Sequence, residues 1–214
     1  MTRRTAPLRY PRGMQRYQPG TALVVVDLQN DFADPAGGLS VAGGDAIVPT
    51  VNGEIAMARN NGALVVATQD WHPESTPHFA KDGGIWPVHC VAETWGAALH
   101  PDLAIPDDAP RVRKGANGED GYSGFTMRDP TTGETIPTEL ESILRAADVR
   151  RVVVVGLATD YCVKATALDA VRLGFETSLL TDAVAAVDLE PGDGGRALDE
   201  MRGAGVVMWR TVMR

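Results

Sequence analysis

The stretch TALVVVD at residues 21–27 decides the fold class of this 214-residue chain. Its apolar and β-branched residues run without the polar alternation of a strand that has one face in water, which is typical of a strand buried on both faces. Further strands are expected at 63–68 (ALVVAT), 111–114 (RVRK), 152–156 (VVVVG), 177–181 and 206–209.

Segments with helical patterns separate these strands. Helices are expected over 45–60, 138–147, 160–173 and 194–203, and Thr138 and Glu141 have the spacing of a capping box at the start of the second one. Strands that alternate with helices imply a parallel sheet with helices on both faces. We therefore predict a single α/β domain over residues 21–214.

The composition excludes several classes of protein. Hydrophobic residues make up 44% of the chain, which is too high for a disordered protein, and no apolar run approaches the ~20 residues that span a bilayer. Two cysteines cannot form a disulfide framework, so free thiols in a reducing cytoplasm are expected. The sequence thus predicts a cytoplasmic protein without a membrane partner.

The charge is unevenly distributed along the chain. Residues 1–20 hold five arginines and no acidic residue, and they are expected to form a basic, flexible arm. Removing these five charges from the net charge of −8 leaves −13 for the remainder. An acidic body repels phosphate, so no nucleic-acid partner is expected.

Three chemically useful residues follow predicted strands. In a parallel α/β sheet, functional groups gather at the carboxyl ends of the strands. Asp27 ends the first strand, Lys114 ends the third, and Cys162 starts the helix after the fourth, where unpaired N–H groups stabilise a thiolate. Together they suit nucleophilic catalysis, with the acid accepting the thiol proton and the cation holding the thiolate. Taken singly, they also fit a turn cap, a surface lysine and a buried cysteine.

A second group of polar residues lies within one 20-residue window. Asp70 and His72 are two residues apart and share a face of an extended segment, while His78 and His89 follow in the loop. Carboxylate and imidazole ligands suit Zn, Fe or Mn. The alternative is a set of ordinary loop histidines that make hydrogen bonds.

Six motifs occur in an order that resembles one known family. They are DLQNDF at 27–32, QDWHP at 69–73, WPVHC at 86–90, KG at 114–115, YSGF at 122–125 and GLATDYCV at 156–163. Over about residues 20–210 the chain resembles the nicotinamidases (pyrazinamidases) of the isochorismatase-like cysteine hydrolases. The resemblance implies a three-layer α/β/α fold with a six-stranded parallel sheet.

The resemblance also implies roles for individual residues. Asp27, Lys114 and Cys162 become the catalytic triad. The N–H groups of Ala158 and Cys162 become an oxyanion hole, next to a cis peptide bond between Leu157 and Ala158. The aromatic pocket is implied at Phe32, Trp86 and Tyr122, and the metal ligands at Asp70, His72 and His89, with His78 at a position that ligates the metal in some members.

The implied reaction is hydrolysis of nicotinamide to nicotinic acid and ammonia through a thioester, in NAD salvage. The cofactor would be one divalent metal ion, zinc before iron or manganese. Pyrazinamide is expected as a side substrate, and self-association is expected because relatives often self-associate. An isochorismatase-like hydrolase of another small amide or carbamoyl compound is the alternative, and the metal ligands favour nicotinamide. A dinucleotide site at 192–197 (GDGGRA) is not expected, because the preceding strand ends about ten residues earlier.

Overall fold

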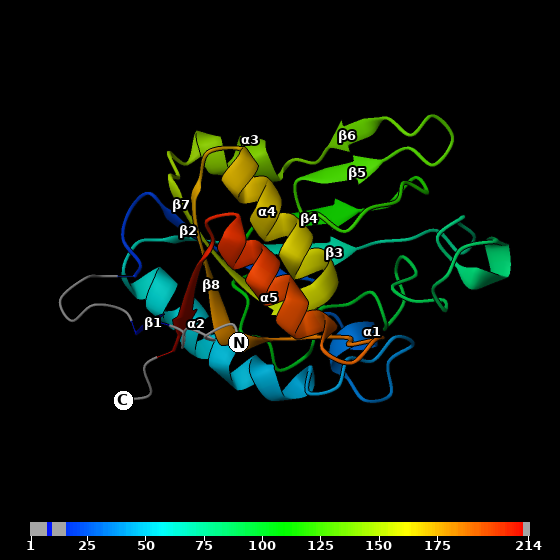
Figure 1. Ribbon diagram of the computed structural model, residues 1–214, viewed down its shortest axis with the longest axis horizontal. Helices are drawn as coiled ribbons and strands as arrows, with labels where there is room; N and C mark the ends of the chain where they lie inside the picture. Colours follow the sequence, from blue (N-terminus) through cyan, green and yellow to red (C-terminus); the bar gives the residue numbers. More distant parts are fainter. Residues whose placement is uncertain (1–7, 10–15, 212–214) are drawn as a thin grey trace.

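The computed structural model describes residues 8–9 and 16–211, and its centre is a parallel β-sheet (Figure 1). The strand order is β1-β9-β8-β7-β2-β3-β4. All neighbouring strands in this sheet are parallel. The strands are β1 Leu8–Arg9, β2 Thr21–Val26, β3 Leu64–Asp70, β4 Arg111–Lys114, β7 Arg151–Leu157, β8 Glu176–Ala185 and β9 Val207–Arg210. The six predicted strands are confirmed, and the two-residue β1 adds a seventh beside β9.

Helices cover both faces of the sheet, as predicted. They are α1 Asn30–Ala33, α2 Val48–Asn60, α3 Leu140–Ala146, α4 Lys164–Arg172 and α5 Asp193–Gly203, with short 3-10 turns at Asp45–Ile47 and Ala80–Asp82. Helices α4 and α5 lie side by side (Figure 1). Among the described residues, no helix is long and apolar enough to cross a membrane.

Strand β2 explains the continuous apolar run of the sequence. All six of its residues are buried. Leu23 and Val25 pack with α2 in one hydrophobic core, whereas Ala22 and Val24 pack with α3, α4 and α5 in another. The central strand therefore has no wet face, and the three layers of the predicted fold are confirmed.

The segment just before β2 is packed onto the domain. Tyr17 is only 2% exposed, and its hydroxyl donates a 2.7 Å hydrogen bond to Glu54 Oε2 on α2. Arg16 Nη1 lies 2.6 Å from Glu54 Oε1. Arg16 and Tyr17, at the end of the predicted arm, therefore pack against α2. Most of the predicted arm, 1–7 and 10–15, lies outside the described residues.

Two features differ from the sequence-based expectation. A small antiparallel hairpin, β5 Thr126–Arg128 and β6 Thr135–Pro137, lies between β4 and α3, where no strand was predicted. The predicted capping box does not form. It would need the Glu141 carboxylate to accept the Thr138 N–H, but that N–H donates to Phe125 O and the carboxylate pairs with Arg145. The Thr138 hydroxyl instead accepts a hydrogen bond from the Leu140 N–H, which still caps the start of α3.

Candidate active site

The three predicted catalytic side chains come from three strand ends and meet beneath one cavity. Asp27 follows β2 with a positive φ of 45°, a conformation that aspartate adopts more readily than most residues. Lys114 is the last residue of β4, and Cys162 lies in a π-helical turn, Thr159–Val163, directly after β7. The parallel sheet therefore brings residues 48 to 135 positions apart to one edge.

Lys114 joins the other two members of this cluster. Its Nζ lies 2.8 Å from Asp27 Oδ2 and 3.6 Å from Cys162 Sγ. The reactive atoms of Asp27, Asp70 and Cys162 lie within 4.8 Å of one another. All four side chains are buried. An acid, a cation and a thiol are thus in direct reach of one another, out of bulk water.

The contact between Thr68 and Asp27 was not predicted from the sequence. Its hydroxyl donates a 2.6 Å hydrogen bond to Asp27 Oδ1 and accepts one of 3.2 Å from the Asp27 N–H. Thr68 lies on β3 two residues before Asp70, so both side chains share a face of the strand. That spacing is the signal that could have identified it.

Burial is the largest single influence on the pKa values of Asp27, Lys114 and Cys162. It raises the pKa of Asp27, against the opposing effect of Lys114. Burial also raises the pKa of the Cys162 thiol well above its ordinary value, and the Lys114 charge only partly offsets this. Burial disfavours the charged form of Lys114, but Asp27 and Asp70 outweigh it and raise the lysine pKa. The raised pKa favours the protonated thiol, so the nucleophile requires a base.

Three histidines gather next to this cluster. Their available ring nitrogens in His72, His78 and His89 lie within 4.8 Å of one another. His89 Nδ1 donates to Pro87 O at 2.7 Å, and His78 Nδ1 lies 2.8 Å from Asp120 Oδ1, so each keeps its Nε2 lone pair. His72 is 3% exposed, and within the described part of the chain neither of its ring nitrogens has a hydrogen-bond partner.

Asp70 lies between the histidines and the triad. Its Oδ1 is 2.6 Å from Lys114 Nζ, and its Oδ2 is 3.9 Å from His72 Nε2 and 4.0 Å from His89 Nε2. Lys114, His72 and His89 overcome the effect of burial and lower the Asp70 pKa to about 2. A buried imidazole without partners is costly, and an ionised carboxylate beside three imidazoles is a suitable donor set for a divalent cation. The four residues therefore fit a divalent metal ion.

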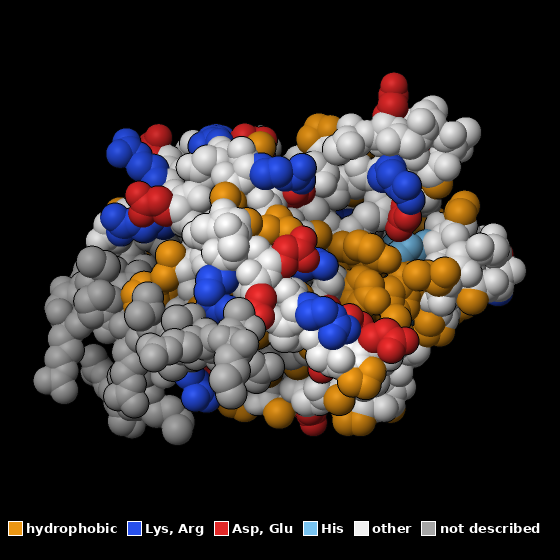
Figure 2. All heavy atoms as spheres, in the orientation of Figure 1, with side chains coloured by type: hydrophobic (Ala, Val, Ile, Leu, Met, Phe, Trp, Pro, Cys, Tyr) orange, Lys and Arg blue, Asp and Glu red, His pale blue; other side chains and the backbone are white. Residues whose placement is uncertain are grey.

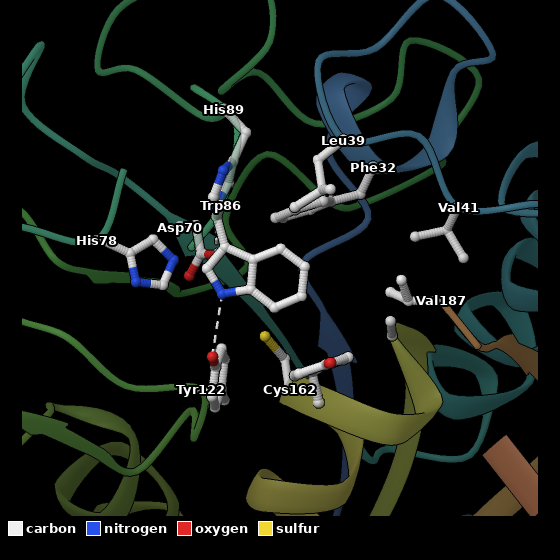
Figure 3. A pocket seen from close by; sticks show the side chains of 12 residues that line it. Phe32, Leu39, Val41, Asp70, His78, Trp86, His89, Tyr122, Cys162 and Val187 are labelled. Carbon is white, nitrogen blue, oxygen red and sulfur yellow. Dashed lines mark hydrogen bonds and ion pairs between the residues drawn. The ribbon is translucent and has the colours of Figure 1, made fainter. Parts of the chain in front are cut away.

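Cys162, Asp70, His78 and His89 line one small cavity, and the side chains of Asp27, Lys114 and His72 are buried next to them (Figure 3). The Cys162 sulfur points into it beneath the Trp86 ring, with His78, His89 and Asp70 on one side. Apolar side chains close the other side: Phe32, Leu39, Val41 and Val187. The aromatic and apolar lining suits a small, flat ligand.

The expected aromatic and backbone features lie around this cavity. Trp86 Nε1 donates a 3.0 Å hydrogen bond to the Tyr122 hydroxyl, which fixes both rings. Tyr161, next to the thiol, packs edge-on against Trp86 with ring centroids 4.9 Å apart. Ala158 lines the cavity with Cys162, and the peptide bond between Leu157 and Ala158 is cis, as expected. Figure 2 shows hydrophobic side chains gathered beside a recessed histidine on this face.

Known proteins are similar to this chain in sequence and fold over most of its length. The chain is 38% identical over 207 residues to a nicotinamidase of Escherichia coli, covering 89% of this chain and 95% of the relative. A crystal structure of the pyrazinamidase of Pyrococcus horikoshii in complex with zinc has a TM-score of 0.80 and 45% identity, covering 90% of this chain and all of the other. The structure of PnC1 from L. infantum in complex with nicotinate has a TM-score of 0.81 and 37% identity, covering 90% and 93%.

A family model supports the same assignment. The model for the isochorismatase domain matches residues 21–211, which is nearly the whole described chain. The parallel sheet, the buried acid, lysine and thiol, and the adjoining histidines agree with the resemblance of the six motifs. This chain therefore belongs to the isochorismatase family.

Proposed function

We propose that this protein is a nicotinamidase, a metal-dependent cysteine amidohydrolase that converts nicotinamide to nicotinic acid and ammonia and serves NAD salvage. One observation carries the proposal beyond the family: Cys162 of the Asp27–Lys114–Cys162 cluster lines the same small, mostly apolar cavity as His78 and His89 of the histidine group. The similarity to nicotinamidases at 37–40% identity supports it. Pyrazinamide is the proposed side substrate.

The cavity suits a flat and neutral ring. Phe32, Trp86 and Tyr122 offer aromatic surfaces, and aromatic pairs contribute about 0.5–1.5 kcal/mol beyond burial of their area. Next to these rings, Asp70, His72, His78 and His89 would hold the metal, with zinc preferred over iron or manganese. When bound, the metal supplies a Lewis acid that fixes the ring nitrogen and thereby orients the carboxamide towards Cys162.

In the first half-reaction, Asp27 acts as the base. It takes the Cys162 proton while the sulfur bonds to the carboxamide carbon, and the N–H groups of Ala158 and Cys162 hold the resulting oxyanion. Lys114 keeps its charge throughout because two carboxylates face it. As the carbon–nitrogen bond breaks, protonated Asp27 returns the proton to the nitrogen, and ammonia leaves. The acyl group remains on Cys162 as a thioester.

In the second half-reaction, water replaces the sulfur. Asp27, ionised again, takes a proton from the water as its oxygen bonds to the thioester carbon. The carbon–sulfur bond then breaks, and the thiolate regains the proton from Asp27. Nicotinic acid leaves, and the site returns to its resting state with a neutral thiol.

A panel of substrates tests this proposal. The purified protein would be incubated with nicotinamide, pyrazinamide, N-carbamoylsarcosine and ureidoacrylate, and the released ammonia measured. Isochorismate would be followed by its loss. The highest kcat/KM is expected for nicotinamide. A higher kcat/KM for any of the non-aromatic compounds would overturn the substrate assignment and favour the wider hydrolase alternative.

A further inference from the structure

We propose that Asp120 is a positioning residue for the metal centre, which it serves by orienting His78 as a fourth ligand. The inference rests on the metal site of the proposed function and deepens it. It concerns the one histidine whose participation the sequence left open.

The contact between the two side chains defines the state of the imidazole. Asp120 Oδ1 lies 2.8 Å from His78 Nδ1. Asp120 Oδ1 accepts this hydrogen bond from His78 Nδ1, as a carboxylate oxygen does. Nε2 is thus the ring nitrogen of His78 left to bind a metal ion. The imidazole ring stacks on His72, with centroids 4.9 Å apart and planes 23° apart.

The backbone holds Asp120 firmly in place. It forms an antiparallel bridge with Arg128, the last residue of β5, through N–H to O bonds of 2.8 and 2.6 Å. The N–H of Gly121 donates to Asp120 Oδ1 at 2.8 Å, and Arg128 Nη2 lies 2.9 Å from Oδ2. Both carboxylate oxygens thus have partners besides His78. The β5–β6 hairpin therefore fixes the Asp120 carboxylate behind His78.

This arrangement differs from an ordinary surface ion pair. Exposed pairs usually contribute little to stability, and the Arg128 side chain, 61% exposed, belongs to such a pair. The His78 side chain is only 6% exposed, so its end of the contact is sheltered from water. A carboxylate behind a metal-binding imidazole fixes its tautomer and raises its basicity.

The three histidines are oriented by different means. A backbone carbonyl orients His89, and His72 has no hydrogen bond to its ring among the described residues. His78 is thus the histidine held by a charged partner. Removing that partner should change the metal affinity without removing any ligand.

Zinc affinity tests the inference. Metal-free Asp120→Ala and wild-type proteins would compete for zinc with a chromogenic chelator. The variant should bind zinc roughly 10–100-fold more weakly, as is typical for loss of such a partner. Glu134→Ala is the matched control, because it removes an exposed carboxylate from the same hairpin and should leave the affinity unchanged. Asp120→Asn keeps an acceptor oxygen and should fall between wild type and Asp120→Ala.

A double-mutant cycle separates positioning from a general structural effect. In a His78→Ala background, Asp120→Ala should cause no further loss of zinc affinity, because the oriented ring is gone. In the cobalt-loaded protein, Asp120→Ala should change the visible d–d absorption bands, whereas Glu134→Ala should not. A zinc affinity for Asp120→Ala within twofold of wild type would overturn the inference, and so would an equal loss in the His78→Ala background.

The outcomes for the proposed function are distinct from these. A wild-type protein that shows the expected cycle but releases no ammonia from nicotinamide would refute the substrate and leave the role of Asp120 intact. A wild-type protein that binds no zinc would overturn the role of Asp120, whatever the amidase assay shows.

Discussion

Replacing Thr68 by valine isolates one hydrogen-bonding group behind the catalytic base. Valine keeps the branched shape of threonine and exchanges the hydroxyl for a methyl group, so no cavity forms. The change removes the 2.6 Å hydrogen bond to Asp27 Oδ1 and the acceptor for the Asp27 N–H. The substitution leaves the candidate metal ligands and all three triad residues unchanged.

The structure sets the size of the effect on stability. A hydrogen bond to a charged group contributes about 1.5–3 kcal/mol, and a neutral one about 0.5–1.5 kcal/mol. Both groups are fully buried, so water does not replace the lost partner. The free energy of unfolding should fall by about 2–4 kcal/mol. For a domain of this size, Tm should fall by roughly 4–16 °C.

The effect on the reaction has a definite sign. The hydrogen bond from Thr68 lowers the Asp27 pKa, so its loss raises a pKa that burial has already raised. Asp27 must be ionised to accept the thiol proton. The acid limb of the pH profile of kcat/KM should therefore move to higher pH, with activity lost first at low pH and retained on the alkaline side.

The assay is ammonia release from nicotinamide across a pH series, with thermal unfolding measured in parallel. Thr177→Val is the matched control, because this buried threonine donates only to Phe175 O, away from the site. It should lose stability and keep the wild-type acid limb. A folded Thr68→Val protein whose acid limb coincides with that of wild type would refute the assignment of Asp27 as the base.

Three further perturbations test the site. Cys162→Ala should abolish amidase activity while circular dichroism and metal content stay unchanged, and full residual activity would refute the nucleophile. His72→Ala should lower the metal content measured by atomic emission and raise KM; unchanged metal stoichiometry would contradict the ligand set. Gly115→Ala should lower both metal content and Tm, because its Cβ would lie 2.7 Å from His72 Nδ1. Gly118→Ala, at a similar positive φ but in open space, should cost only about 1 kcal/mol of stability, and an equal loss of metal in both variants would argue against the contact.

The main sheet could be predicted because its strands are buried on both faces. An uninterrupted β-branched run such as 152–156 (VVVVG) is typical of a buried strand, and the structure has this strand at Arg151–Leu157. Two parts of the sheet lack that signal. β1 pairs through two residues only, and β8 continues to Ala185 through the polar pair Thr181 and Asp182, past a register shift against β7.

The catalytic cluster was predictable because each member closes a recognisable strand or opens a helix. The Asp120–His78 contact was not predicted because it joins residues 42 positions apart, which no local pattern encodes, whereas the spacing of Thr68 and Asp70 on one strand was a signal that was not used. A cytoplasmic location and self-association stay predictions.

The position of Asp70 gives the buried cluster an unusual electrical character. Without metal, one ammonium group faces two carboxylates, so the floor of the cavity carries an excess of one negative charge. A divalent cation held by Asp70 would turn that excess into a single positive charge. The potential at the Cys162 sulfur should therefore become more positive with metal loading, and the thiol should be more readily ionised in the loaded protein. Through Asp70, the proposed nucleophile and the proposed metal centre are thus electrostatically coupled.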